Sequence, residues 1–454
     1  FKGKCLIMVY DKTDKYSIEK YAQKLVGKTF NDICKEDLND TIVIESENTY
    51  ALAHGDKKRK GGLGEIVEER FFQYKANSDS SPDFKEAGVE LKVTPYKINK
   101  NKSISAKERL VLTMIDYNSV INEKEFDSSH FWYKSQWLLL VYYLWQKEIK
   151  DRLDYRIDYA RLFTPSEEDL EVIRNDYFKI IEKIEAGYAH ELSESDTMYL
   201  SACTKSSDSS VVRAQPNSDI PAKPRAFAYK SSYMTYVLNH YIHGAKPKYE
   251  SIIKNDNIKD IEAYITDKIN KHKGKSVTEL CADYDIEFDK IPKNLYAMLA
   301  YRMLGITSNN AEEFVKANIK VKTIRIDKNN TIKENMSFPT FDFISITKQD
   351  WEESEFYELL SSTKFLFIVY HEREDGLYNF DHAQFWNIPY KTLNGEVKEV
   401  WEETKQIALN PPSVLKQVNG KYRSQTIREY FLRKQIIQYA MLDHMEKIQR
   451  THYL

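Results

Sequence analysis

Cysteine is scarce in this chain of 454 residues, which contains four: Cys5, Cys34, Cys203 and Cys281. They lie far apart and include no C-x-x-C pair, the spacing that is typical of zinc and redox sites. Four cysteines in a chain of this length are also too few for a disulfide framework. The pattern therefore argues against a structural zinc site and against a redox function.

Long hydrophobic runs are missing as well. The longest purely apolar segments, residues 138–143 and 365–370, are far shorter than the roughly 18 residues that suggest a membrane span. The opening segment 5–10 is shorter than the core of a secretory signal, and no small-residue cleavage pattern follows it. We therefore interpret the apolar runs as buried strands and predict a cytoplasmic protein without a membrane partner.

The chain has no excess charge of either sign, because 67 Lys and Arg stand against 69 Asp and Glu, a net charge of −2. Nucleic-acid binding would therefore need a localised basic face. Apolar and aromatic residues are plentiful: 42% of the chain is hydrophobic, with 32 Tyr and 21 Phe, enough for substantial cores. At roughly 150 residues per domain, the length favours two large globular domains.

The chain also repeats itself, with four anchors in the same order. Each pair shares its apolar pattern: residues 26–34 with 273–281, 62–72 with 294–304, 83–92 with 313–322, and 138–143 with 365–370. The first pair predicts a Gly turn before a helix, the second a helix, and the fourth a strand. We infer two homologous α/β (α+β) domains, residues 15–245 and 246–454, joined near a Gly- and Pro-containing linker at 243–250.

A Ser-rich polar stretch interrupts the first copy at residues 201–224 and contains Lys205, Arg213 and Lys223. Its composition predicts a long functional loop. The corresponding stretch of the second copy, residues 411–427, is shorter.

The candidate catalytic residues of the first copy are Asp83 and the segment Glu90-Leu-Lys92. Alternation on a strand places Glu90 and Lys92 on one face, while Asp83 can reach them from a preceding turn. Two converging carboxylates suit Mg²⁺, and a neighbouring lysine can hold the attacking water and offset phosphate charge. This arrangement suits phosphodiester hydrolysis. Because the spacing is common in charged chains, an edge strand with a solvated charged face is the alternative interpretation.

The sequence around the motif favours the first of these interpretations. The run from Lys60 to Glu68 (KGGLGEIVE), then Pro82-Asp83, then Ala87 to Lys92 (AGVELK) resembles the MutH family of the PD-(D/E)xK nucleases. The resemblance is closest to the restriction branch, the Sau-three-A type endonucleases that cut GATC. Further matches lie at residues 107–112, 189–194, 199–200, 203–205, 225–227, 336–338 and 350–354. The resemblance covers nearly the whole chain.

This resemblance implies two tandem restriction-endonuclease-like domains, each with a central mixed sheet flanked by helices. It implies that Asp83 and Glu90 bind Mg²⁺, that Lys92 orients the water, and that Glu68 and Lys134 complete the catalytic site. Double-stranded DNA is the expected partner. The residues expected to contact DNA lie in the later part of the domain: Lys205, Ser206, Arg213, Arg225 and Lys230.

The second copy has lost most of these residues. Ala300 stands at the position of Glu68, Glu313 at that of Asp83, Lys320 at that of Glu90, Ser361 at that of Lys134, and only Lys322 keeps its identity. A lysine at a ligand position places a positive charge where Mg²⁺ would bind. We therefore expect a degenerate domain with a DNA-binding or allosteric role, as the resemblance also implies.

Three functions remain open: a type II restriction endonuclease that cuts GATC, a strand-nicking mismatch-repair endonuclease of the MutH kind, and a non-catalytic DNA-binding effector. Intact Asp83, Glu90 and Lys92 argue against the effector. The repair branch has a tyrosine associated with adenine methylation where this chain has Ala228, which favours restriction. A palindrome has two scissile phosphates and each chain has one catalytic site, so cutting both strands needs either two chains on one site or two successive nicks. A DNA-induced homodimer or a two-site complex is therefore one expectation.

Overall fold

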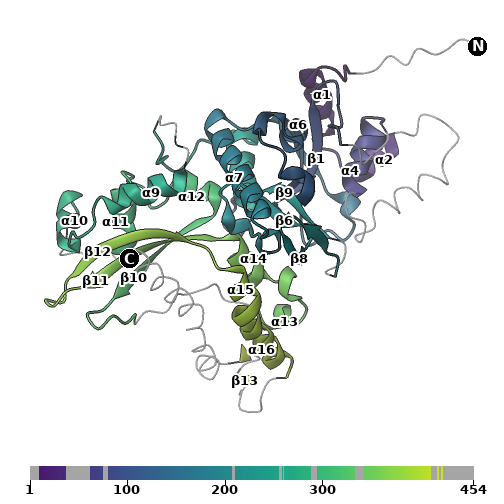
Figure 1. The fold of residues 1–454 in the computed structure, drawn as a ribbon. Coiled ribbons are helices and arrows are strands. Elements are labelled where there is room, and N and C mark those ends of the chain that lie inside the picture. The colour runs from purple at the N-terminus through teal and green to yellow at the C-terminus, as the bar shows by residue number, and fades with distance from the viewer. Residues whose placement is uncertain are drawn as a thin grey trace, which may run out of the picture. The chain divides into compact units, whose positions relative to one another are not determined.

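The computed structural model describes residues 10–36, 62–74, 80–206, 210–254, 258, 260–287, 294–332, 342–410, 417–418 and 421–422. The chain divides into two compact units (Figure 1). Unit 1 comprises Phe1–His190, Thr197–Lys248 and Val315–Ala317, and unit 2 comprises Glu191–Asp196, Tyr249–Phe314 and Asn318–Leu454. Apart from Val315–Ala317, unit 1 therefore ends at Lys248. Within the described ranges, no helix combines the length and apolarity needed to cross a membrane.

The central sheet of unit 1 has the strand order β2-β1-β4-β5. Its strands are β1 (Val89–Ile98), β2 (Ile104–Ala106), β4 (Trp137–Leu144) and β5 (Ile157–Phe163). Strands β1 and β4 are parallel, and the other two pairings are antiparallel. The sheet is therefore mixed, as expected, and the apolar run 138–143 forms its buried middle strand.

Helices cover one face of this sheet: α1 (Lys15–Ala22), α2 (Phe30–Glu36), α4 (Gly62–Ile66) and the π-helical turn η3 (Val67–Phe71). Ile18 and Ile66 pack there against Val89, Leu139 and Ala160 of the strands. The remaining helices of unit 1 are α5 (Tyr117–Val120), α6 (His130–Ser135), α7 (Glu167–Glu185), α8 (Ser231–Val237) and the π-helical turn η8 (Leu238–Ile242). The expected helix at 62–72 is thus confirmed as α4 and η3.

A second, antiparallel sheet of unit 1 corrects one expectation. Its order is β3-β9-β6, formed by β3 (Leu110–Met114), β6 (Leu200–Thr204) and β9 (Arg225–Tyr229), and β7 (Arg213–Gln215) pairs with β8 (Ser218–Ala222). The Ser-rich stretch 201–224 therefore contains most of β6 and the whole of β7 and β8, and its described part is not one continuous loop. Its small residues suit a tight sheet: Ala202 and Cys203 are buried, and Asn217 adopts a left-handed turn at φ 55° between β7 and β8.

Unit 2 is built on the sheet β10-β11-β12, formed by β10 (Ile319–Ile326), β11 (Lys364–Glu372) and β12 (Tyr378–Trp386). Helices α9 (Ile261–Asn270), α10 (Val277–Asp283) and α11 (Leu295–Met303) contact these strands (Figure 1). The other elements are α12 (Glu312–Ala317), α13 (Phe343–Ile346), α14 (Glu355–Ser362), α15 (Tyr390–Thr392), η11 (Leu393–Val397), α16 (Lys398–Leu409), β13 (Gln417–Val418) and β14 (Lys421–Tyr422). Most of residues 411–427 lies outside the described residues.

The two sheets share one register. Strand β1 pairs with β4 in parallel, with Glu90 opposite Leu138, and β10 pairs with β11 in parallel, with Lys320 opposite Phe365. The next strand is antiparallel in both units, where Phe163 pairs with Leu138 and Trp386 with Phe365. A register shift follows at the same point of each middle strand, between residues 142 and 143 and between 369 and 370.

The turns before the second helix of each unit also agree. Gly27 adopts φ 89° and donates its N–H to the Ile157 carbonyl at 2.8 Å, while Gly274 adopts φ 87° and donates to the Phe380 carbonyl at 2.8 Å. Such positive φ values favour glycine. Shared register, bulge and turn show that the internal repeat read from the sequence is a repeat of structure.

Asp176 of α7 fastens this helix to the start of β6. Its buried carboxylate accepts the N–H groups of Met198 at 2.8 Å, Tyr199 at 2.6 Å and Leu200 at 2.9 Å. Burial raises the pKa of Asp176, while these three N–H groups and the charge of Lys230 oppose that rise.

Asp176→Ala should therefore lower the free energy of unfolding by about 3 kcal/mol or more, since it leaves three buried donors without an acceptor. Urea denaturation followed by tryptophan fluorescence measures this. Asp14→Ala is the control, because Asp14 caps α1 with one exposed bond to the N–H of Tyr16, and removal of such a cap costs about 1 kcal/mol. Equal losses in the two variants would contradict the fastening role of Asp176.

Candidate active site

A tight turn carries Asp83 to the strand that bears the other acidic residue. The N–H of Phe84 donates to the Val89 carbonyl at 2.9 Å, and the N–H of Val89 returns to the Phe84 carbonyl at 3.2 Å. Gly88 adopts φ 65° within this turn, a conformation that glycine adopts without strain. As a result the Asp83 Oδ2 accepts the N–H of Leu91 at 2.8 Å.

Strand β1 and helix α6 bring two lysines to one oxygen of Glu90. The Oε1 of Glu90 lies 2.8 Å from the Nζ of Lys92 and 3.6 Å from the Nζ of Lys134. Lys134 reaches this point from the last turn of α6, whose N-terminus Ser129 caps by accepting the Trp132 N–H. The structure therefore brings Asp83, Glu90, Lys92 and Lys134 together.

Glu68 approaches the same group from η3, at the end of the helix that begins with α4. Burial, followed by the negative charges of Asp83 and Glu90, raises the pKa of Glu68 to about 7. Burial and the charge of Glu90 raise the pKa of Asp83 to about 6, although the Leu91 N–H and the two lysines oppose the rise. Three carboxylates thus share one poorly solvated place.

Tyr74 is a residue of this site that the sequence interpretation missed. Its hydroxyl is buried and, among the described residues, has no hydrogen-bond partner. Burial and the charges of Asp83, Glu68 and Glu90 raise the pKa of Tyr74 far above its ordinary value. The preceding Gln73 adopts a left-handed conformation, φ 57°, which turns the chain after η3. A lone tyrosine carries no motif, so only its closeness in sequence to Glu68 offered a signal.

The residues present fit Mg²⁺. Glu90 is 4% exposed and its Oε2 is buried without a hydrogen-bond partner among the described residues, so this oxygen can serve as a ligand. As placed, no group of three or more His, Cys, Asp or Glu side chains in the described ranges could hold a metal ion. Mg²⁺ often uses one or two carboxylates and keeps several waters, which the pair Asp83 and Glu90 can provide.

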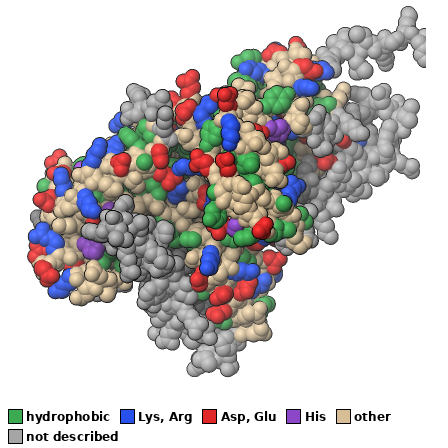
Figure 2. Space-filling view, viewed as in Figure 1, with side chains coloured by type: hydrophobic (Ala, Val, Ile, Leu, Met, Phe, Trp, Pro, Cys, Tyr) green, Lys and Arg blue, Asp and Glu red, His purple; other side chains and the backbone are tan. Residues whose placement is uncertain are grey.

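The residues expected to contact DNA fall into two groups. Lys205 and Arg213 are exposed and Ser206 is half-buried. By contrast, Arg225 is buried and donates to the Ala202 carbonyl at 2.9 Å, and Lys230 is buried and donates to the Thr197 carbonyl at 2.6 Å. This placement offers neither Arg225 nor Lys230 to DNA, because both cations are used inside unit 1. Figure 2 shows basic and acidic side chains interspersed on the visible face.

In unit 2 the corresponding strand carries no acidic residue at the ligand position. Lys320 is exposed and Lys322 is half-buried, and burial, followed by the charge of Lys320, lowers the pKa of Lys322. The Glu313 carboxylate is buried and accepts the Ser251 hydroxyl at 2.6 Å and the backbone N–H groups of Ile252 and Ile253 at 3.0 Å and 3.1 Å.

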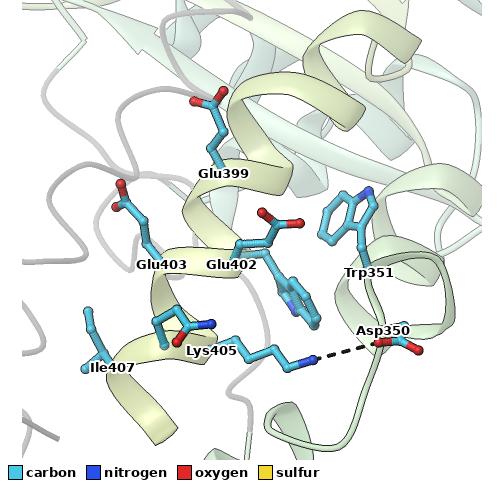
Figure 3. A pocket seen from close by; sticks show the side chains of 9 residues that line it. Asp350, Trp351, Glu399, Glu402, Glu403, Lys405 and Ile407 are labelled. Atoms are coloured by element: carbon cyan, nitrogen blue, oxygen red, sulfur yellow. Dashed lines mark ion pairs between the residues drawn. The ribbon is translucent and has the colours of Figure 1, made fainter. Parts of the chain in front are cut away.

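A pocket of about 770 Å³ lies elsewhere in unit 2 (Figure 3). Trp351 and Trp401 line it together with four acidic residues, Asp350, Glu399, Glu402 and Glu403. Its lysine, Lys405, lies 3.9 Å from Asp350. The excess of carboxylates would repel phosphate groups, so this pocket does not suit a nucleic acid.

Comparisons with known proteins agree with the internal repeat. A family model described as "DNA mismatch repair enzyme MutH" matches residues 72–176 and 304–394. The first segment contains β1 and β4, and the second contains β10 and β11. The chain is also 39% identical, over 372 residues, to the type II restriction enzyme Sau3AI of Staphylococcus aureus, a match that covers 77% of this chain and 74% of that enzyme.

The raised pKa values predict that the metal-free protein loses stability as pH rises from about 5 to 8. Between the ordinary carboxyl pKa values and the folded values of about 7 for Glu68 and about 6 for Asp83, the folded chain holds more protons than the unfolded chain. The free energy of unfolding therefore falls with rising pH. Thermal melts in EDTA across this range should show a falling midpoint, and Mg²⁺ should raise the midpoint most at pH 8.

Glu68→Gln should make the melting midpoint fall less steeply with pH, because it removes the carboxyl group with the higher of the two pKa values. Glu86→Gln makes the same charge change on an exposed residue and should keep the wild-type slope. A Glu68→Gln protein whose midpoint falls as steeply as that of the wild type would contradict the assigned environment of Glu68.

Proposed function

Because this chain belongs to the MutH-like type II restriction endonucleases, we propose that it cuts both strands of DNA at the palindrome GATC, with water activated by Mg²⁺. The observation that carries the proposal is the convergence of Lys92 and Lys134 on one oxygen of Glu90, beside Asp83. A solvated edge strand would leave its charged residues exposed, whereas Glu90 is buried. The preference for GATC rests on the resemblance to the GATC-cutting branch.

Asp83 and Glu90 are the proposed ligands of Mg²⁺, which when bound would supply a Lewis acid and a water of lowered pKa. The Oε2 of Glu90 is the better-placed ligand atom, because Oε1 already faces two ammonium groups. The Oδ2 of Asp83 is held by the Leu91 N–H at 2.8 Å, which fixes the orientation of the carboxylate and leaves Oδ1 for coordination.

Lys92 and Lys134 differ in their proposed roles because they come from different elements. Lys92 extends from the same strand as Glu90, so it can hold the attacking water by a hydrogen bond as DNA binds. Lys134 extends from α6 and can offset the negative charge that develops on the phosphate. Without DNA, both ammonium groups compensate the buried Glu90 carboxylate.

Glu68 is the proposed proton acceptor. A general base works best when its pKa lies near the working pH, and burial beside two other carboxylates raises the pKa of Glu68 to about 7. A group with the ordinary pKa of glutamate would be a weaker base toward water.

Unit 2 is proposed to bind DNA without cutting it and to act as an effector of unit 1. Support comes from Lys320 at the position of Glu90 and from Ala300, which is buried, at the position of Glu68. One catalytic site per chain cannot reach both scissile phosphates of a palindrome at once. A DNA-induced homodimer or a two-site complex is therefore part of the proposal.

Lys205, Ser206 and Arg213 are the proposed DNA contacts of unit 1, because Lys205 and Ser206 directly follow β6, Arg213 begins β7, and both cations are exposed. Arg225 and Lys230 would act indirectly by holding β9 to its neighbours.

A strand-nicking repair endonuclease is the second candidate, since the matched family model is named for a mismatch-repair enzyme. Ala228 weighs against it: the side chain is small and buried in β9 and offers no polar group to an adenine amino group.

Asp83→Ala and Glu90→Ala should each lower cleavage of plasmid DNA by at least ~1,000-fold, because each removes a proposed ligand of an ion that supplies several kcal/mol. DNA binding in EDTA, measured by fluorescence anisotropy, should stay within about twofold, since no phosphate contact is lost. Glu86→Ala is the control for loss of one acidic side chain and should cut normally. Cleavage near the wild-type rate by either variant would contradict the assignment of Asp83 and Glu90 to the catalytic site.

Sequencing the ends produced with Mg²⁺ should show cuts at every GATC and nowhere else. Fully adenine-methylated plasmid should be cut at the same rate as unmethylated plasmid, because Ala228 provides no partner for the adenine amino group. Resistance of the methylated plasmid would instead support a methylation-reading repair function, and nicked circles as the final product would support strand nicking.

A further inference from the structure

The strand of unit 2 that corresponds to the catalytic strand carries an inverted charge. The shared register places Lys320 where unit 1 has Glu90, and Lys322 where it has Lys92. On a strand, residues two apart lie on one face, so the two ammonium groups of unit 2 are neighbours. Burial, followed by the charge of Lys320, lowers the pKa of Lys322, as expected for two like charges on one face of a strand.

No carboxylate among the described residues compensates this pair. No acidic oxygen in those ranges forms an ion pair with Lys320 or Lys322, whereas the neighbouring Lys364 is buried and paired with Glu262 at 2.7 Å. Lys364 stands opposite Ile319 in the register, so it belongs to the other face of the sheet. Lys364 on β11 therefore has an ion-pair partner. Lys320 and Lys322 have none among the described residues, and they lie on the face of β10 that corresponds to the catalytic face of β1.

Glu313, the acidic residue that could have compensated the charge of the lysines, forms hydrogen bonds with other groups. Glu313 corresponds to Asp83, but its Oε1 accepts the Ser251 hydroxyl and the N–H groups of Ile252 and Ile253, and its Oε2 shares the Ile252 N–H. Within the described ranges, Asp83 by contrast accepts the N–H of Leu91 on the catalytic strand. Glu313 therefore stabilises the segment around residues 251–253 and leaves the lysines without a counter-charge.

We propose that Lys320 and Lys322 form a binding site for a phosphate group of duplex DNA, at the place in unit 2 where unit 1 would hold its metal and scissile phosphate. Two adjacent ammonium groups supply the charge that a divalent ion would otherwise bring to the phosphate. Without metal ligands the site holds the phosphodiester and leaves it intact. The inference deepens the proposed function, on which it rests for DNA as the ligand.

The test is the number of duplexes that one full-length chain binds in EDTA, where no cleavage occurs. A short GATC duplex is titrated into the wild type and into the double variant Lys320→Glu/Lys322→Glu, and binding is followed by calorimetry and sedimentation. We expect two duplexes per wild-type chain and one per variant chain. The plot of log K against log salt concentration should become shallower by about 0.9, the contribution of the one phosphate contact that is lost.

Lys271→Glu/Lys328→Glu is the matched control, because both lysines are exposed in unit 2 and the charge change is the same. It should keep two duplexes; loss of the second duplex by the control as well would reduce the effect to net charge and overturn the site. One duplex per wild-type chain would also overturn it. If Lys322→Glu disturbs the fold, as judged by circular dichroism, the exposed Lys320→Ala alone should still weaken the second binding step by about tenfold, and unchanged affinity would overturn the proposal.

Cleavage of plasmid in Mg²⁺ is measured in parallel. A chain that binds two duplexes but cuts no GATC would defeat the proposed function and leave the phosphate site standing. A chain that cuts GATC but binds one duplex would support the proposed function and overturn the phosphate site.

Discussion

The buried carboxylate of Glu90 is the constraint around which the catalytic unit is arranged. A charged group that is 4% exposed must be compensated, since isolated burial of a charge is very unfavourable. The compensation comes from Lys92 on the same strand and Lys134 on α6, both directed at one oxygen. Because one oxygen faces both cations, the other is left for a further cation. The residual charge of the site therefore favours a metal ion.

The same constraint explains why Asp83 and Glu68 have raised pKa values. Each carboxylate lies near Glu90 in a place where water screens poorly, so their charges oppose one another. An arrangement of this kind lowers the stability of the metal-free protein and raises its affinity for a cation. Functional sites commonly carry such unfavourable electrostatics, which the surrounding fold must support. Here the support is the parallel pairing of β1 with β4 and the tight turn at Gly88.

Much of this could be predicted from the sequence, because the decisive signals are local. The apolar runs at 138–143 and 365–370 are buried strands, and alternation places Glu90 and Lys92 on one face of β1. The four repeat anchors anticipated the shared register. The failures have a common cause, since composition does not reveal partners distant in the chain. The Ser-rich stretch forms strands because β6 finds β9, and Lys230 is buried because Thr197 accepts its ammonium group. Tyr74 was missed for the same reason.

Comparison of the two units separates what the fold requires from what the chemistry requires. Gly27 and Gly274, the parallel strand pair and the register shift recur in both units, so they belong to the scaffold. At the positions of Glu68 and Glu90 unit 2 has Ala300 and Lys320. At the position of Asp83 it has Glu313, which is engaged with backbone N–H groups. Lys320 therefore places a positive charge at the position where unit 1 has the Glu90 carboxylate. Under the proposed function, this exchange would let unit 2 attract a phosphate group of DNA without binding a catalytic metal ion.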